Sequence, residues 1–136
     1  AAYALRLDLG RALTRTGPLA WRDRGAGPVA AAPETAGDVV LARKDVGASY
    51  HLAVVVDDAA QGITLVTRGH DLFAATHVQR VLQALLGLPE PAYEHHRLVL
   101  DDAGHRLAKR TPGVTLAELR AAGATAKSIR NRLGFD

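Results

Sequence analysis

The chain has 136 residues, of which 17 are Lys or Arg and 14 are Asp or Glu, so its net charge is +3 at pH 7. It contains no cysteine, which excludes disulfides and thiolate metal sites, and no apolar run of about 18 residues, which excludes a membrane-spanning helix. The length fits one domain or half of a larger one, and the basic balance is compatible with a polyanionic partner without requiring one.

Three short strands are predicted in the N-terminal third. Residues 3–9 alternate apolar and polar side chains, as in a half-buried strand, and do not have the basic and apolar regions of a signal peptide. Residues 19–23 and 37–43 are also strand-like, and residues 25–33 between them, rich in small residues, Gly and Pro, are expected to form a loop. We expect the three strands to form a small antiparallel patch, distinct from the rest of the chain.

From Ser49 onward, helices and strands alternate. Apolar residues spaced by three and four positions predict an amphipathic helix that begins near Ser49 and ends at Gly62. The elements expected after it are a strand over 63–67, a helix over 71–86, a strand over 97–100 and short helices over 115–122 and 125–133. This alternation is typical of an α/β protein with a parallel sheet.

Tyr50 and Arg68 are candidate ligands for a small carboxylate. Tyr50 opens the predicted helix, and Arg68 follows the strand predicted over 63–67. Strand ends are the usual ligand edge of an α/β sheet, an arginine binds a carboxylate through two parallel hydrogen bonds, and a tyrosine offers a hydroxyl on a rigid ring. Taken singly, each residue is also explained by a buried ring with a satisfied hydroxyl or by a surface ion pair.

The segment 106–110 carries three positive charges, on Arg106, Lys109 and Arg110. It follows a predicted strand and a glycine turn, so it could form a cationic loop that stabilises the charge of a reacting polyphosphate. From these five residues alone, a solvated basic loop is the alternative. Together with Tyr50 and Arg68, the loop suggests a site that holds a small carboxylate beside a polyphosphate.

The remaining charged groups indicate no catalytic cluster. Neighbouring side chains on a helix point about 100° apart, so Asp57 and Asp58 are interpreted as a polar helix face rather than a dyad. The rings of His95 and His96 should diverge, and with no cysteine nearby we expect no metal site. The basic tail forms either a solvated face or contacts to a phosphate backbone. Its charged residues are Arg120, Lys127, Arg130 and Arg132.

Taken in chain order, several short blocks resemble the class I glutamyl-type aminoacyl-tRNA synthetases. The blocks are YHLAVVVDD over 50–58, GIT over 62–64, RGHD over 68–71, LLGLP over 85–89 and RLAKR over 106–110. The likeness covers nearly the whole chain and is strongest over 38–110, and RLAKR corresponds to the family's KMSKS loop. Within the family the chain is most similar to the glutamyl-Q tRNA(Asp) synthetases, because only two short predicted helices follow Arg110.

This resemblance implies an α/β fold: the second half of a Rossmann-type parallel sheet, preceded by a small antiparallel β patch and followed by short helices. It implies an enzyme that activates glutamate with ATP and Mg²⁺ and transfers it to the queuosine base in the anticodon of tRNA(Asp). Tyr50 and Arg68 would hold the glutamate. Lys109 would be catalytic and contact the ATP phosphates together with Arg106 and Arg110. We expect a cytoplasmic monomer without a membrane partner.

The same resemblance divides the chain into three segments and marks three departures. Residues 1–37 would end the inserted acceptor-binding-type β region, residues 38–112 would form the second catalytic half, and residues 113–136 a short helical end. The family's first loop lysine is Arg106 here, its loop serine is Ala108, and its asparagine after the tyrosine is His51. None of these changes removes a charge, so we expect tuning rather than loss of activity.

The family's HIGH-type motif and its cysteine-rich zinc site have no counterpart in this sequence. Since the chain also begins at Ala1 rather than at an initiator Met, we expect it to be the C-terminal half of a longer enzyme, inactive alone, with any zinc in the missing half. Two alternatives stay open. One is a truncated glutamyl-tRNA synthetase of protein synthesis, and the other is a non-catalytic RNA-binding module derived from a synthetase.

Overall fold

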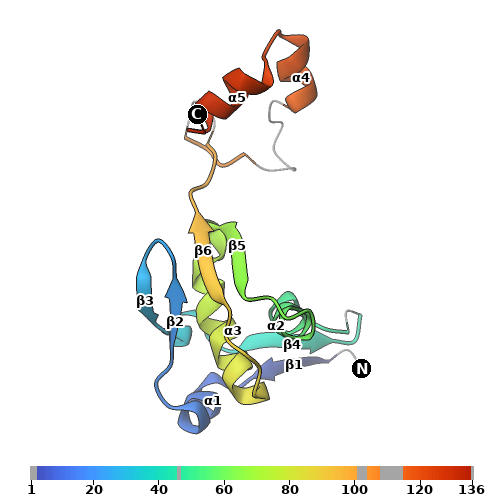
Figure 1. Cartoon of the computed structure of the whole chain (residues 1–136). Helices are drawn as coiled ribbons and strands as arrows, with labels where there is room; N and C mark the ends of the chain where they lie inside the picture. Colours follow the sequence, from blue (N-terminus) through green and yellow to red (C-terminus); the bar gives the residue numbers. More distant parts are fainter. Residues whose placement is uncertain (1–2, 46, 101–103, 108–114, 136) are drawn as a thin grey trace. The chain divides into compact units, whose positions relative to one another are not determined.

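The computed structural model describes residues 3–45, 47–100, 104–107 and 115–135 (Figure 1). These residues form two compact units, of which the first ends at His96 and the second begins at Arg97. The first unit carries two sheets and the longer helices, and the second carries two short helices. The mixture of helices with a sheet that contains parallel strands confirms the predicted α/β class.

A four-stranded sheet in the order β3-β2-β6-β5 is the centre of the first unit. Strands β5 (Leu65–Gly69) and β6 (Ala92–His96) run parallel over their full length, and β2 (Ala20–Asp23) joins β6 in parallel at the pair Asp23–Tyr93. Strand β3 (Gly27–Ala30) is antiparallel to β2. Three neighbouring strands therefore share one direction, and their carboxyl ends meet at one edge of the sheet.

A second sheet consists of β1 (Ala4–Leu7) and β4 (Val39–Arg43), paired antiparallel. The antiparallel patch predicted at the N-terminal end is therefore present, but its membership was wrong in one respect. The strand predicted over 19–23 does not join it; it forms β2 and lies in the parallel sheet. The reason is tertiary: Trp21 is almost fully buried, and the rings that surround it include Tyr93 of β6 and Phe73.

Two of the longer helices begin at a residue whose side chain accepts a hydrogen bond from a backbone N–H of the first turn. Asp8 caps α1 (Leu9–Thr16) by accepting a hydrogen bond from the backbone N–H of Arg11, and Ser49 caps α2 (Tyr50–Ala60) in the same way through Leu52. Helix α3 (Phe73–Leu86) follows the 3-10 turn η2 (His70–Leu72) and ends at Gly87, whose φ of 65° is left-handed. A second 3-10 turn, η1, covers Pro33–Ala36.

The core is built around α3. Val78, Val81 and Leu82 on this helix are nearly inaccessible to solvent and pack against Val55 of α2 and against α1. Burying each such aliphatic side chain contributes about 1.5–3 kcal/mol. On the side of the sheet, α3 is joined to β6 by a hydrogen bond of 2.9 Å from Gln83 Nε2 to the Tyr93 hydroxyl. The helix therefore fixes the strands whose carboxyl ends carry the polar side chains of the candidate site.

At three places in the chain the structure differs from what the sequence predicted. The loop expected over 25–33 contains β3, because a tight turn after Asp23 lets the chain pair back on β2. The strand expected over 97–100 is displaced to β6, which pairs with β5 from Ala92 onward. Helix α1 was not predicted, and Leu9, assigned to the first strand, is buried on it.

The second unit contains α4 (Leu116–Ala121) and α5 (Ala126–Arg132), as predicted. Both helices begin with a capping box, formed by Thr115 with Glu118 and by Thr125 with Ser128. An isolated bridge joins Leu100 and Arg106. None of the helices within the described residues has the length and apolar character needed to cross a membrane.

Candidate functional site

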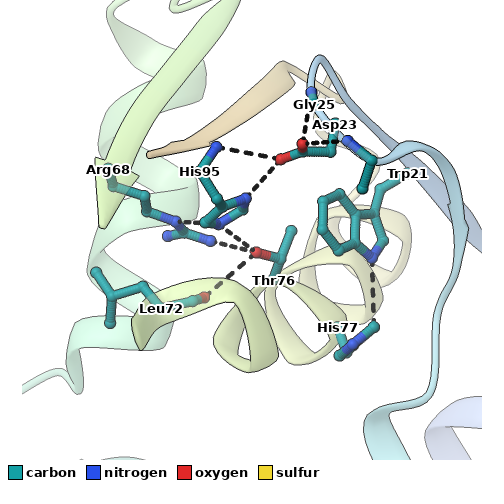
Figure 2. A network of polar contacts seen from close by, with 9 residues as sticks. Trp21, Asp23, Gly25, Arg68, Leu72, Thr76, His77 and His95 are labelled. Carbon is teal, nitrogen blue, oxygen red and sulfur yellow. Dashed lines mark hydrogen bonds and ion pairs between the residues drawn. The ribbon is translucent and has the colours of Figure 1, made fainter. Parts of the chain in front are cut away.

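Three polar side chains from three adjacent parallel strands lie together at the carboxyl edge of the sheet. Asp23 is the last residue of β2, His95 lies near the end of β6, and Arg68 lies near the end of β5. Figure 2 shows the three side chains in line, with Thr76 of α3 beside the guanidinium. This edge is where open α/β sheets bind their ligands.

Arg68 is held on several sides, although it carries a charge and is only 9% exposed. Its Nε donates to His95 Nε2 over 3.0 Å, its Nη2 donates to Thr76 Oγ1 over 2.5 Å, and its Nη1 donates to the Tyr50 hydroxyl over 3.4 Å. The guanidinium carbon also lies 5.1 Å from the centre of the Tyr93 ring, in a cation–π contact. Three of the five guanidinium N–H groups are used by these bonds, so Nη1 and Nη2 each keep one more.

The predicted partners Tyr50 and Arg68 are thus brought into contact. Tyr50 is the first residue of α2 and is half exposed, so its hydroxyl stands between the buried guanidinium and the surface. A surface pocket of about 300 Å³ adjoins it. The residues that line this pocket are Val40, Ala42, Arg43, Ala48, Ser49 and Tyr50. The role of Tyr50 and Arg68 in holding a small carboxylate stays a prediction.

The arginine fixes the tautomer of His95. Because a guanidinium can only donate, His95 Nε2 must accept the bond from Arg68, and the ring proton lies on Nδ1. That proton is donated to Asp23 Oδ2 over 2.7 Å. The His95 side chain is 1% exposed. Burial lowers the pKa of His95 most, and the charges of Arg68 and His70 lower it further, whereas Asp23 opposes them. His95 is therefore neutral at physiological pH.

Asp23 is the last group in this series of hydrogen bonds, and both of its carboxylate oxygens accept. Its Oδ1 accepts hydrogen bonds from the backbone N–H groups of Gly25, at 2.8 Å, and Ala26, at 2.9 Å, and its Oδ2 accepts from the backbone and ring of His95. Burial alone would raise the pKa of Asp23, but the bonds from His95, Ala26 and Gly25 outweigh it and lower the pKa. Asp23 stays ionised and ties the β2–β3 turn to β6.

An aromatic cluster surrounds the hydrogen-bonded side chains of Asp23, His95 and Arg68. Trp21 donates from Nε1 to His77 Nδ1 over 3.3 Å (Figure 2). The backbone N–H of Ala32 donates to the same atom over 3.2 Å. Burial lowers the pKa of His77, and Glu34 opposes the shift. Phe73 lies 5.1 Å from the His95 ring centre and 4.8 Å from Trp21. The rings exclude water from the side of His95 that faces α3.

The charge of Arg68 also affects the pKa values of two further groups, Asp58 and His51. Burial raises the pKa of Asp58 and Arg68 opposes the rise, while burial and then Arg68 lower the pKa of His51. Asp57 is exposed and Asp58 half-buried on α2, in agreement with a polar helix face. Among the residues that the structure describes, no three His, Cys, Asp or Glu side chains gather in a way that could hold a metal ion.

Comparison with known proteins decides the family. A family model described as the catalytic domain of class I tRNA synthetases (E and Q) matches residues 4–134. The chain belongs to this family. It is 53% identical to a glutamyl-Q tRNA(Asp) synthetase of Rhodobacter capsulatus over 97% of its own length, and 45% identical to that of Symbiobacterium thermophilum over 86%. It spans 49% and 36% of those two relatives.

A solved structure agrees with this assignment. A glutamate tRNA ligase from Elizabethkingia meningosepticum, crystallised in complex with its amino acid, matches 70% of the chain with a TM-score of 0.60 and 27% identity, and the match covers 19% of that ligase. A glutamate-tRNA synthetase from Elizabethkingia anophelis gives a TM-score of 0.56 at 29% identity over 68% of the chain. The parallel sheet is therefore that of a class I glutamyl-type synthetase, as the resemblance implied.

The synthetase loop predicted over 106–110 is only partly described. Arg106 is exposed and its backbone forms the bridge to Leu100, whereas Ala108, Lys109 and Arg110 lie outside the described residues. Their contact with ATP stays a prediction. In the tail, the basic residues on or beside α4 and α5 are exposed, and the choice between a solvated face and a phosphate contact stays open. These residues are Arg120, Lys127, Arg130 and Arg132.

Sequence reasoning found Tyr50 and Arg68 but missed the groups that hold Arg68. His95 was considered only as a metal ligand, and Asp23 and Thr76 were not considered. One signal was present: Asp23 is the last residue of one predicted strand, and Arg68 directly follows another. Since the strand order is not written in the sequence, this similarity could not be turned into a contact between β2, β6 and β5.

Proposed function

We propose that the complete gene product activates glutamate with ATP and transfers the glutamyl group to the queuosine base in the anticodon of tRNA(Asp). The observation that carries this proposal is the Arg68–Tyr50 pair at the carboxyl edge of the parallel sheet. The names of the Rhodobacter and Symbiobacterium relatives support the choice of substrate and tRNA. Because the chain covers about half of the Rhodobacter relative, the activity belongs to the whole protein and this chain contributes one part of the site.

In this proposal Arg68 and Tyr50 hold the glutamate. The guanidinium edge formed by Nε and Nη2 is occupied by His95 and Thr76, so the substrate carboxylate would approach from the side of Nη1 and the Tyr50 hydroxyl. A charge-assisted bond to a carboxylate is roughly twice as strong as a neutral one. A buried arginine that is already oriented loses little rotamer freedom when it binds, which favours tight and selective recognition.

Lys109 is proposed to act on the ATP, with Arg106 and Arg110 beside it. The attack of the glutamate carboxylate on the α-phosphate is an in-line displacement, so the protein contributes position and positive charge rather than acid–base chemistry. Mg²⁺ prefers oxygen ligands and is commonly held largely by substrate phosphates and water. The described residues offer no dedicated cage of side chains for it, so the proposal has it arrive with ATP.

The proposal also covers domain organisation and partners. Residues 1–37 would end the acceptor-type insertion, residues 38–112 complete the catalytic half and residues 113–136 form a helical end. Strands β2 and β3 belong to the first of these segments and share a sheet with β5 and β6 of the second. The exposed basic residues of α4 and α5 are candidates for tRNA contact. A tRNA-modifying monomer would work in the cytoplasm.

The test is glutamate-dependent ATP–pyrophosphate exchange by the complete gene product, followed by transfer of labelled glutamate to RNA. We expect label on tRNA(Asp) that contains queuosine, in the anticodon fragment after nuclease cleavage, and none on tRNA(Asp) without queuosine. Label at the 3′ end of tRNA(Glu) would instead indicate a glutamyl-tRNA synthetase of protein synthesis. RNA binding without exchange would indicate a non-catalytic module.

The matched variants are Arg68→Lys and Arg24→Lys. Arg68→Lys keeps a charge but loses the planar fork, so the KM for glutamate should rise at least tenfold. Arg24 is exposed and pairs with Glu94 at 3.5 Å, so Arg24→Lys should leave the KM for glutamate unchanged. Equal KM values for the two variants would remove Arg68 from the glutamate site.

A further inference from the structure

A continuous line of hydrogen bonds crosses three strands and ends at the proposed glutamate ligand. The line runs from Asp23 of β2 through His95 of β6 to Arg68 of β5 (Figure 2). We propose that Asp23 and His95 are positioning residues, which hold Arg68 in its binding orientation only while His95 carries a single proton. This inference rests on the proposed function, because it assigns a role to Arg68 toward an anionic substrate.

The geometry makes the proton on His95 decisive. Arg68 Nε reaches His95 Nε2 at 3.0 Å, and this contact is a hydrogen bond only if Nε2 has no hydrogen. A second proton on the ring would leave two donors facing each other and two positive charges at hydrogen-bond distance. The edge of Arg68 formed by Nε and Nη2 would then lose His95 as an acceptor. Because Asp23 accepts from Nδ1 at 2.7 Å, it selects the tautomer that leaves Nε2 as an acceptor.

The charged and titratable groups that face His95 come from several elements. Asp23 approaches from β2, Arg68 from β5, His70 from η2 with ring centres 6.4 Å apart, and Tyr93 stacks on the ring within β6 at 6.0 Å. Helix α3 contributes only the neutral side chains of Thr76 and Phe73. Of these groups, Asp23 alone favours a second proton, and the net effect of burial and the two cationic neighbours lowers the pKa of His95.

A role in packing alone does not account for this arrangement. Burying a carboxylate, an imidazole and a guanidinium in one layer costs free energy that apolar side chains of the same volume would not. Every polar atom of the line is nevertheless directed to a partner: Asp23 uses both oxygens, and His95 uses both ring nitrogens. Nε and Nη2 are both engaged, on the same edge of the guanidinium, which sets the plane of the group. The bonds therefore fix an orientation of Arg68 as well as its place.

Two substitutions at His95 separate its contacts. In His95→Gln, the longer amide can place an oxygen where Nε2 lies, so the acceptor for Arg68 is kept and cannot become a cation. In His95→Asn, the shorter amide can still donate to Asp23 but does not reach Arg68. The matched control is His77→Asn, since His77 is another partly buried histidine that accepts through Nδ1 and does not contact Arg68.

The experiment measures glutamate KM and ATP KM by pyrophosphate exchange between pH 5 and pH 8, with the complete gene product. We expect the glutamate KM of the wild type to rise as the pH falls through the pKa of His95, which burial lowers from the ordinary histidine value. His95→Asn should raise the glutamate KM at least tenfold at pH 7.5 and leave the ATP KM unchanged. His95→Gln should keep the glutamate KM within threefold of the wild-type value and abolish the rise of this KM at acid pH. Asp23→Asn should raise the glutamate KM at all pH values.

Several results would overturn the proposal. One is a glutamate KM in His95→Asn and His95→Gln that follows His77→Asn at every pH. Another is a ring ¹⁵N spectrum of the wild type that places the proton of His95 on Nε2. If His95→Asn does not fold, His95→Gln and the ¹⁵N spectrum still decide, because neither depends on it.

Failure of the proposed function is distinguishable from failure of the positioning role. If Arg68→Lys leaves the glutamate KM unchanged, the proposed glutamate site is wrong whatever His95 does. A readout that needs no substrate is the NMR resonance of Arg68 Nε, which should shift as His95 is titrated. It should also differ from the wild type in Asp23→Asn but not in His77→Asn. If the Arg68 Nε resonance does not change while His95 is titrated, the positioning role is refuted even in an active enzyme.

Discussion

Arg68 donates a hydrogen bond from Nη2 to the hydroxyl of Thr76 over 2.5 Å, and Thr76 is fully buried on α3. This contact links the strand that carries the proposed ligand to the helix at the centre of the core. Since Thr76 Oγ1 also lies 3.3 Å from His95 Nε2, one hydroxyl contacts both the arginine and the histidine. Thr76 Oγ1 therefore links the proposed substrate site to the core.

Replacing Thr76 by Val should destabilise the fold. The two side chains have nearly the same shape, but Val leaves a buried guanidinium N–H without an acceptor, which costs about 1–3 kcal/mol. Thr76→Ser keeps the hydroxyl and is the matched control. The free energy of unfolding by urea, measured on the complete gene product, checks the prediction. Equal values for Thr76→Val and Thr76→Ser would show that the hydroxyl is not needed.

Replacing Tyr50 by Phe should weaken glutamate binding without changing stability. Tyr50 is half exposed, so we expect water to replace its hydroxyl as the acceptor for Arg68 Nη1, and the lost bond is worth about 0.5–1.5 kcal/mol. The KM for glutamate should therefore rise roughly two- to tenfold. Tyr3→Phe removes the same atom from another exposed tyrosine and should change nothing. A glutamate KM in Tyr50→Phe that equals that of Tyr3→Phe would exclude the hydroxyl from the site.

Replacing Lys109 by Ala should slow glutamate activation sharply. Loss of one group that stabilises charge in a transition state typically lowers kcat by a factor of about 10²–10³. Lys109→Arg keeps the charge and should retain a larger share of the rate. The measurement is pyrophosphate exchange at saturating glutamate, with Lys127→Ala, a basic residue of α5, as the control. An unchanged rate in Lys109→Ala would remove this residue from the ATP site.

The stability of the fold should fall on mild acidification. The pKa values of His51, His77 and His95 are all lowered from 6.5, chiefly by burial. The unfolded chain therefore binds more protons than the folded one between the lowered values and pH 6.5, and stability rises with pH across that window. We expect a smaller free energy of unfolding at pH 5.5 than at pH 7.5. Equal values at the two pH values would mean that these rings are not protected from protonation.

A second loss of stability should follow in stronger acid. The pKa of Asp23 is lowered from 3.8, because its hydrogen bonds outweigh the effect of burial. A lowered carboxyl pKa contributes stability that is complete above about pH 4 and is lost as the pH falls through the folded-state value. The difference in unfolding free energy between the wild type and Asp23→Asn should therefore shrink below about pH 4. A constant difference would assign the effect of Asp23→Asn to packing.

Local signals in the sequence were sufficient to predict the helices whose ends are marked by a capping residue or a glycine. Ser49 marks the start of α2, Gly87 the end of α3, and Thr115 and Thr125 the starts of α4 and α5. These signals act within one turn of a helix, so they do not depend on the rest of the fold. The sequence also indicated Tyr50 and Arg68 as candidate ligands for one small carboxylate, and in the structure these two side chains are in contact.

Pairing between distant strands was not readable in the same way. The position of β6 depends on its register with β5, in which Leu65 faces Ala92, and tertiary pairing of this kind overrides local propensity. The aromatic pocket around Trp21 draws β2 away from β1 and β4. Asp23 and His95 became part of the site only through these pairings, which is why their roles were missed.

The bond between Asp23 and His95 closes a loop of 72 residues, and this separation has a consequence for how the site comes into being. Contacts so distant in sequence form late in folding, because the entropy of closing the loop must be offset by many other contacts first. Arg68 acquires its fixed orientation only after β2 has docked on β6. A synthesised chain should thus gain its helices well before the proposed glutamate site takes its final form, and docking of the β2–β3 hairpin would be the step that completes this site.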